Sequence, residues 1–208
     1  MRHGFLTIAA ILWAGAAGAQ TLTPVSAIPA DRQVLPVHVG GRVVAHPLPG
    51  NTTEYEHQWP GVYFESRFDG TQVYLAFNDA LNEYRLLIDG QAPLTVNQPG
   101  KGAFEITGLA PGAHGIRLEK ITESQAVSGA FDGFFIAANE KALPIGGRVR
   151  QMEFIGDSSM TGYGDRSTTR QCTDEERRAR TDTQQGFAAL TAKHFDADYQ
   201  INAISGAA

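Results

Sequence analysis

The stretch VYFESRFDGTQVYLAFNDALNEYRLLIDG, residues 62–90, decides the fold of the first part of the chain. Apolar and polar residues alternate along three of its segments, 62–68, 72–79 and 83–90. Alternation with a period of two is typical of half-buried antiparallel strands. Turn signals separate the segments: Asp69-Gly70 and Asp89-Gly90. The stretch therefore predicts consecutive antiparallel strands joined by tight turns.

The same pattern continues beyond this stretch. Segments 102–107 and 114–122 are also predicted strands, and no helical pattern lies between them. Regular strand spacing without a helix indicates a β-sandwich or barrel. Further turn signals are Pro99-Gly100, Pro111-Gly112 and Asp132-Gly133. Aromatic side chains can supply its core: Phe64, Phe68, Phe77, Phe104, Phe131, Phe134 and Phe135.

The pattern changes near residue 145. A strand is predicted over 148–155, a polar loop over 165–182, a helix with Asp182 as N-cap, and a second strand from 197. This order predicts one βαβ unit. A single βαβ unit cannot bury both faces of a parallel sheet, so we expect the chain to be a fragment of a longer protein. The predicted domains are a sandwich over 20–145 and an incomplete second domain over 146–208.

Residues 1–19 are expected to precede the fold. A basic start is followed by a short apolar run and by Ala17-Gly18-Ala19, a cleavage pattern. This predicts a signal peptide cleaved after Ala19 and a secreted or periplasmic protein. The apolar run is too short to span a bilayer, and no later segment is long enough, so no membrane span is predicted. The net charge is −5 without a Lys/Arg-rich run, which argues against a nucleic-acid partner. Cys172 is the only cysteine, so no disulfide can form within the chain.

The segment GDSSMTGYGD, residues 156–165, invites three chemical interpretations. A phosphate-binding loop is excluded because five residues separate Gly156 from Gly162 and Tyr163 follows where that motif has lysine. A calcium loop is excluded because its twelfth position is Thr168 in place of a bidentate glutamate, and no helix precedes it.

The third interpretation is a turn that presents a nucleophilic serine. Ser158 follows a predicted buried strand, and open α/β sheets place their sites at the carboxyl ends of parallel strands. Backbone N–H groups at the start of the next turn can face a developing oxyanion. The G-x-S-x-G elbow of α/β-hydrolases is absent. From spacing alone, both a nucleophile turn and a plain connecting loop fit this segment.

The sequence also resembles a known family. FIGDSSMTGYGD resembles the first block, Gly-Asp-Ser, of the SGNH (GDSL-type) hydrolases, and AISG places the glycine of the second block at Gly206. The sandwich half, with HQWPGVYFESRFDGTQVYLAF, NEYRLLIDG, GLAPGAHGIRLEKITES and FDGFFI, resembles the jelly-roll domain of carbohydrate esterase family 2. That family joins such a jelly roll to an SGNH domain. The expected fold is thus an all-β jelly-roll sandwich followed by the first βαβ unit of an α/β SGNH-hydrolase domain.

The resemblance implies a serine carbohydrate esterase that removes O-acetyl groups from plant polysaccharides such as acetylated xylan or glucomannan. Ser158 would be the nucleophile, and the backbone N–H groups of Ser158 and Gly206 would form the oxyanion hole. No metal or organic cofactor is implied. The family's catalytic histidine comes from a later block that these 208 residues do not contain, so we expect the chain alone to be inactive. Two alternatives are a non-catalytic carbohydrate-binding sandwich and an SGNH esterase or lipase that acts on a non-sugar ester.

Several other polar residues receive structural interpretations. His114 is predicted to hold a turn, and His57 to lie on the rim of the sandwich. His194 is predicted at the C-terminal end of the helix, away from Ser158. Trp59 is a candidate sugar-stacking ring, although packing at the sandwich edge is the simpler interpretation. Asp157 is expected to order the turn through hydrogen bonds to the backbone, because its position beside Ser158 does not suit a triad acid.

Overall fold

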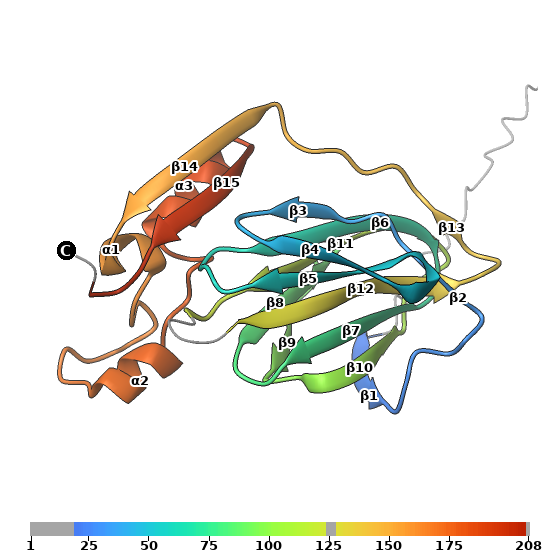
Figure 1. The fold of residues 1–208 in the computed structure, drawn as a ribbon, viewed down its shortest axis with the longest axis horizontal. Helices are drawn as coiled ribbons and strands as arrows, with labels where there is room; N and C mark the ends of the chain where they lie inside the picture. Colours follow the sequence, from blue (N-terminus) through green and yellow to red (C-terminus); the bar gives the residue numbers. More distant parts are fainter. Residues whose placement is uncertain (1–18, 124–127, 207–208) are drawn as a thin grey trace, which may run out of the picture.

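The structure is a computed structural model that describes residues 19–123 and 128–206. The predicted signal peptide, apart from Ala19, lies outside the described residues. Figure 1 shows two antiparallel sheets packed face to face, with a smaller α/β unit at one end. In the part of the chain that the structure describes, no helix is long and apolar enough to cross a membrane.

The first sheet of the sandwich has the strand order β1-β10-β7-β12-β5-β4, and β2 pairs with β12. All of its pairings are antiparallel. Its strands are β1 (Thr21–Val25), β2 (Arg32–Val34), β4 (Val44–Leu48), β5 (Thr52–His57), β7 (Val73–Asp79), β10 (Gly100–Thr107) and β12 (Gly129–Ala137). A short 3-10 helix, Pro49–Asn51, joins β4 to β5.

The second sheet has the order β13-β6-β11-β8-β9, and β3 pairs with β6. These pairings are also antiparallel. Its strands are β3 (His38–Gly40), β6 (Tyr63–Gly70), β8 (Glu83–Ile88), β9 (Leu94–Asn97), β11 (Gly112–Lys120) and β13 (Lys141–Ala142). The strands predicted from the 62–90 stretch are thus β6, β7 and β8, with β7 in the opposite sheet from the other two.

The core lies between the two sheets and is built from the apolar faces of the alternating strands. Its largest fully buried aromatic side chains include Phe64, Phe68, Phe77, Phe131 and Phe134. The sequence-based prediction that Phe135 belongs to this core is wrong. Successive side chains on a strand point to opposite faces, and the neighbours of Phe135 on both sides point inward. The predicted sandwich itself is confirmed.

The α/β unit contains β14 (Arg150–Gly156), α1 (Ser158–Thr161), α2 (Asp174–Ala179), α3 (Phe187–His194) and β15 (Ala197–Ala203). Strands β14 and β15 are parallel and in register from Arg150 opposite Ala197 to Gly156 opposite Ala203. Helix α3 packs small buried residues against β15. The predicted βαβ unit is therefore confirmed. The predicted domain boundary at 145/146 falls in the connection between β13 and β14 and stays a prediction.

Two details of this unit differ from the sequence-based prediction. Helix α3 begins at Phe187 with Gly186 as N-cap, so Asp182 is not its cap. Asp182 instead lies buried and is paired with Arg85 of the sandwich. Its carboxylate is therefore used in this ion pair and does not cap the helix. The stretch 165–182 also contains a helix, α2, where a loop was predicted.

Candidate active site

The turn between β14 and α1 presents Ser158 as the first residue of a short helix. Asp157 is the N-cap, and its carboxylate accepts hydrogen bonds from the backbone N–H and the hydroxyl of Ser159, both at 2.9 Å. The backbone hydrogen bond from Ser159 is the main reason that the pKa of Asp157 lies below its usual value. Asp157 therefore orders the turn as predicted. Ser158 itself is partly exposed.

Glycines close this turn on both sides. A Cβ on Gly156 would lie 2.7 Å from Cγ of Met160, so a side chain there would push against the helix. Gly162 ends α1 with a φ of 67°, and a Cβ there would lie 2.8 Å from the carbonyl oxygen of Asp182. Both the backbone conformation and the space require glycine at residue 162. The turn that carries Ser158 is thus held by its cap and by close packing.

The loop after β15 lies beside this turn. Because Gly156 pairs with Ala203, Ser158 and Gly206 follow their strands at the same edge of the sheet. A direct contact joins the two segments, since the hydroxyls of Thr161 and Ser205 lie 3.0 Å apart. Gly206 has a φ of +87°, a conformation that favours glycine. The structure therefore brings the two predicted site residues to one edge, and their catalytic roles stay predictions.

The loop between α2 and α3 fixes the α/β unit to the end of strand β11. The Thr183 hydroxyl donates to the carbonyl oxygen of Lys120 at 3.1 Å, and the Thr183 N–H donates to that of Ile121 at 2.9 Å. The Gln184 side-chain amide donates to the carbonyl oxygens of Val62 and Lys120. Thr183 and Gln184 are both fully buried. Sequence periodicity could not have identified this contact, because the paired residues are far apart in the chain.

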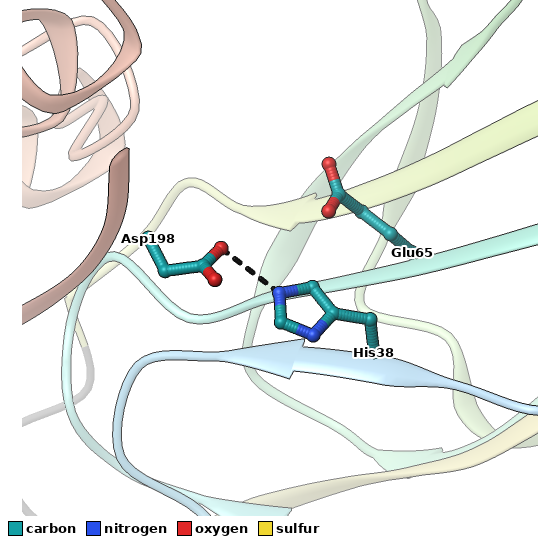
Figure 2. A group of neighbouring side chains, drawn as sticks. All are labelled: His38, Glu65 and Asp198. Atoms are coloured by element: carbon teal, nitrogen blue, oxygen red, sulfur yellow. Dashed lines mark hydrogen bonds and ion pairs between the residues drawn. The ribbon is translucent and has the colours of Figure 1, made fainter. Parts of the chain in front are cut away.

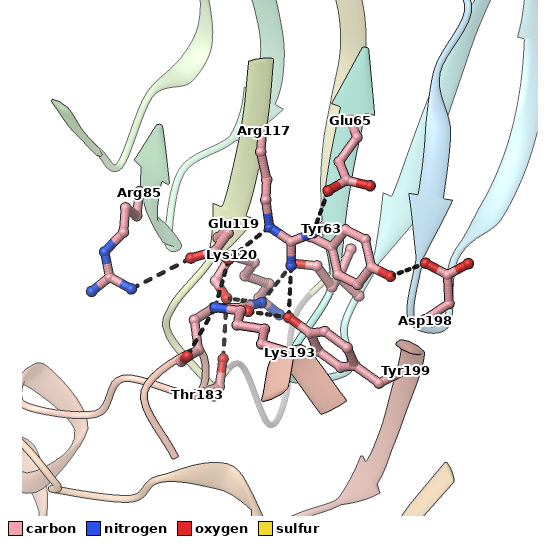
Figure 3. Close-up of polar contacts among 12 residues, drawn as sticks. Tyr63, Glu65, Arg85, Arg117, Glu119, Lys120, Thr183, Lys193, Asp198 and Tyr199 are labelled. Carbon is pink, nitrogen blue, oxygen red and sulfur yellow. Dashed lines mark hydrogen bonds and ion pairs between the residues drawn. The ribbon is translucent and has the colours of Figure 1, made fainter. Parts of the chain in front are cut away.

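Charged pairs surround this junction, as Figure 3 shows. Arg117 of β11 donates to Glu65 at 2.6 Å and to the Tyr199 hydroxyl at 2.9 Å. Lys193 of α3 pairs with Glu119 at 2.7 Å. Burial would lower the pKa of Arg117, but the charges around it outweigh that effect and raise the pKa. Arg117 therefore remains charged and paired with Glu65 in the interface between the sandwich and the α/β unit.

Lys120 is fully buried beneath the same junction. Its Nζ donates to the carbonyl oxygens of Gln58 at 2.6 Å and Trp59 at 3.2 Å. Burial lowers the pKa of Lys120 to about 7, although Asp79 and Glu123 favour its charged form. Its side chain therefore joins the end of β11 to the segment that precedes β6.

At the other end of β15, His38, Glu65 and Asp198 bring their ligand atoms within 4.8 Å of one another. Figure 2 shows the His38 ring facing the Asp198 carboxylate, at 2.9 Å. Arg148, in the connection to β14, pairs with both carboxylates, each at 2.9 Å. The Tyr63 hydroxyl also donates to Asp198, at 2.6 Å. Since the guanidinium of Arg148 already pairs with both carboxylates, we interpret the group as a bridge between the two parts of the molecule.

Comparison with known proteins places this geometry in a family. A family model described as carbohydrate esterase 2 N-terminal matches residues 39–145, more than half of the 208 residues. The chain belongs to carbohydrate esterase family 2. Its match covers the sandwich from β3 onward, so the predicted family is confirmed.

Individual relatives agree with this family 2 assignment. An acetylxylan esterase / glucomannan deacetylase of Cellvibrio japonicus is 49% identical over 172 residues, which are 83% of this chain and 48% of that protein. A solved carbohydrate esterase, described as having an active site with divergent catalytic and non-catalytic binding functions, is 46% identical with a TM-score of 0.76, over 84% of this chain and 51% of that one. A family two carbohydrate esterase from Clostridium thermocellum, solved with cellohexaose, is 27% identical with a TM-score of 0.66, over 82% of this chain and 52% of that one. The family 2 chain thus spans about half the length of these relatives.

The histidines of the family 2 chain take mainly structural positions. The prediction that His57 lies on the rim is wrong, because it is 2% exposed and its Nε2 lies 2.7 Å from the Tyr84 hydroxyl. It packs inside the sandwich because its side chain shares the inward face of β5 with Tyr55. His114 is held by Asp89 and by the carbonyl oxygen of Ala110, which confirms its predicted role at a turn. His194 is exposed and is the last residue of α3, as predicted.

His194 lies far from Ser158 along the parallel strands. It lies three residues before β15 begins, whereas Ser158 follows the carboxyl end of β14. The parallel strands between these two ends span seven residues, or about 20 Å at about 3.3 Å per residue. A general base must lie within hydrogen-bond reach of its nucleophile. His194 does not satisfy that condition.

Trp59 remains partly exposed on the surface of the sandwich. The guanidinium of Arg42 lies 4.9 Å from the centre of its ring. Both side chains line a surface depression of about 380 Å³ together with Glu56. The Trp59 ring therefore packs against Arg42 at the edge of the sandwich, which agrees with the prediction of edge packing.

Proposed function

We propose that the full-length protein is a carbohydrate O-acetyl esterase that removes acetyl groups from polysaccharides or oligosaccharides such as acetylated xylan or glucomannan. The main support is the shared edge at which the turn of Ser158 and the loop of Gly206 are joined by the contact between Thr161 and Ser205. The similarity to an acetylxylan esterase / glucomannan deacetylase supports the substrate class.

The proposed reaction uses Ser158 as the nucleophile. A general base takes the hydroxyl proton of Ser158 as its oxygen attacks the acetyl carbonyl carbon. The bond from that carbon to the sugar oxygen then breaks, and the sugar leaves as a hydroxyl with the proton that the base returns. Water then attacks the acetyl-enzyme and releases acetate. The backbone N–H groups of Ser158 and Gly206 stabilise the negative charge on the carbonyl oxygen in each tetrahedral intermediate. Asp157 holds the turn in place through Ser159 and takes no part in proton transfer.

We assign the general base to a histidine of the family's later sequence block. The described histidines support this assignment, since His57 and His114 are engaged inside the sandwich and His194 lies at the far end of β15. The chain of residues 1–208 alone is therefore proposed to lack normal esterase activity.

Exposed apolar side chains on the α/β unit support a larger SGNH-type domain. Ile155 of β14 is 75% exposed and Phe187 of α3 is 63% exposed. A parallel sheet needs cover on both faces, and β14 and β15 have α3 on one of them. We propose that further elements of such a domain pack on these side chains.

We also propose that the protein is exported through a signal peptide that is cleaved after Ala19. The substrate supports it, because plant polysaccharides lie outside the cell. The evidence for the signal peptide is the basic start, the short apolar run and the small residues within 1–19.

The decisive experiment measures hydrolysis of an aryl acetate by the full-length protein and by its Ser158→Ala variant. We expect the substitution to lower kcat by at least about 10³-fold, because the nucleophile is lost. Ser159→Ala is the matched control, since it removes the adjacent hydroxyl and should keep most of the rate. A Ser158→Ala protein with the normal rate would overturn the proposal. Acetate release from acetylated xylan, compared with cleavage of a long-chain aryl ester, separates the sugar esterase from a lipase.

A second candidate function is carbohydrate binding without catalysis. It is favoured by a relative whose active site is described as displaying divergent catalytic and non-catalytic binding functions, and by one solved with cellohexaose. Calorimetric titration of the Ser158→Ala protein with cellohexaose tests it. Binding by an inactive full-length wild-type protein would favour this candidate over the esterase.

A further inference from the structure

The loop that carries Gly206 is held by a residue of the sandwich. The carboxylate of Glu123, just beyond the end of β11, accepts a hydrogen bond from the Ser205 N–H through Oε1, at 2.6 Å. Its Oε2 lies 2.6 Å from the Ser205 hydroxyl oxygen. Glu123 and Ser205 are both partly buried and lie 82 residues apart in the sequence. A single side chain of the sandwich thus binds both hydrogen-bond donors of the residue next to Gly206.

The direction of the protons in this group is fixed by simple chemistry. An ionised carboxylate only accepts hydrogen bonds, so the single hydroxyl proton of Ser205 points to Glu123. The Ser205 oxygen can then accept the proton of Thr161, whose hydroxyl oxygen lies 3.0 Å away. The Thr161 hydroxyl also lies 3.2 Å from the carbonyl oxygen of Ser158, an alternative acceptor for its single proton. A directed chain therefore runs from Thr161, on the helix that begins at Ser158, through Ser205 to Glu123.

This chain ties together the two segments whose backbone N–H groups would form the oxyanion hole. The N–H of Gly206 is part of the peptide group that follows Ser205, so fixing Ser205 limits how that N–H can rotate. Gly206 adds no side-chain contact of its own, and a Cβ there would meet nothing within 4 Å. The orientation of its N–H therefore depends on Ser205 and on the groups that hold Ser205.

We propose that Glu123 is a positioning residue of the active site, which acts through Ser205 to aim the N–H of Gly206 at the developing oxyanion. The inference rests on the proposed esterase function. In this proposal the sandwich contributes to catalysis, because Glu123, which orients the loop of Gly206, belongs to the sandwich.

The test compares Glu123→Ala and Glu123→Gln in the full-length protein with an aryl acetate as substrate. Glu123→Ala removes both acceptors and should lower kcat about 10- to 100-fold with KM changed less than about twofold, since an oxyanion donor acts mainly in the transition state. Glu123→Gln keeps one oxygen for the Ser205 N–H, and its amide can donate to the Ser205 oxygen. It should therefore recover a large part of the rate lost in Glu123→Ala.

A double-mutant cycle with Ser205→Ala checks that the two residues act together. Because both substitutions disturb one chain, the double variant should be little slower than Glu123→Ala alone. His38→Asn is the matched control, since it removes an interface hydrogen bond at the opposite end of β15. It should lower the melting temperature and leave kcat unchanged.

The outcomes distinguish the two proposals. If Ser158→Ala abolishes hydrolysis but Glu123→Ala lowers only the melting temperature, as His38→Asn does, Glu123 is a structural residue and this inference is wrong. If Ser158→Ala keeps the wild-type rate, the esterase mechanism itself fails. A melting temperature for Glu123→Gln close to that of the wild type ensures that a folded variant is compared.

Discussion

The hydroxyl of Tyr63, on strand β6 of the sandwich, donates a hydrogen bond to the carboxylate of Asp198 on β15, at 2.6 Å. The Tyr63 ring is fully buried and packs against the ring of Tyr199, with their centres 4.8 Å apart. Tyr63 belongs to the apolar cluster of the α/β unit, although it lies on a sandwich strand. The outer face of one sheet is therefore the inner wall of the neighbouring unit, and the two parts share a core.

This packing predicts different costs for two substitutions. Tyr63→Phe removes one hydrogen bond, while Asp198 keeps Arg148 and His38, so we expect a loss of about 1–2 kcal/mol in the free energy of unfolding. In Gly40→Ala the new Cβ would lie 1.9 Å from Cζ of Tyr63, whose ring is fully buried. We expect that variant to lose about 3 kcal/mol or more. Urea unfolding measures both, and equal losses would contradict the shared core.

Arg148 predicts a stability difference that depends on pH. Burial would raise the pKa of Asp198 and of Glu65. Hydrogen bonds outweigh burial and hold both pKa values below the usual range. The main hydrogen bonds come from Tyr63 and His38 to Asp198, and from Arg148 to Glu65. A lowered carboxyl pKa stabilises the folded state above the ordinary values of 3.8 and 4.5, and this contribution is lost as pH falls through the folded value.

Arg148→Met should therefore cost about 2–3 kcal/mol at pH 7, because two partly buried carboxylates lose their shared cation. The difference from the wild type should shrink below about pH 4, where the carboxyl groups of the unfolded chain, and then those of the folded chain, take up protons. Urea unfolding between pH 3 and pH 7 measures it. Lys141→Met, at an exposed position of β13, is the control for loss of a positive charge. A difference that stays constant over this pH range would contradict the bridge.

Lys120 predicts a pH dependence of the same sign, but in the alkaline range and because of burial. The pKa of this buried amine falls from 10.5 to about 7, so between these values the unfolded chain binds a proton that the folded protein lacks. Stability should then rise with pH across this window, by up to about 1.4 kcal/mol per pH unit from this group. Lys120→Met removes the contribution. We expect the free energy of unfolding to rise more steeply with pH in the wild type than in Lys120→Met between pH 7.5 and 9.5, by the slope that about one bound proton gives. Identical slopes would show that the amine titrates normally.

The sandwich was predictable because its strands are half-buried, so that apolar and polar residues alternate along 62–90. The βαβ order was predictable for a similar reason. Helix α2 was missed although Thr173 and Glu176 form a capping box, a local signal that was visible in the sequence. Its helix has no buried residues, so hydrophobic periodicity could not reveal it.

The contacts that join the two parts could not be predicted in this way. Asp182 has the residue type and position of a helix cap, yet it is the buried partner of Arg85. Nothing local to Glu123 indicates Ser205, and nothing local to Gly40 indicates the ring of Tyr63. Such pairs arise only when distant segments meet, so the sequence identified Ser158 and Gly206 by resemblance but not the side chains that support them.

The last prediction concerns the backbone of Gly206 and has a matched control within the chain. Gly206 and Gly90 both have positive φ, +87° and +69°, and a Cβ on either would meet nothing within 4 Å. Alanine at either position should therefore cost a similar, small amount of stability through backbone strain alone. Gly90 lies after β8 in the sandwich, whereas relief of strain at Gly206 would rotate the proposed oxyanion donor. We expect Gly206→Ala to lower kcat for an aryl acetate about 10-fold or more, and Gly90→Ala to keep it. Equal rates in two variants of equal stability would remove Gly206 from the oxyanion hole.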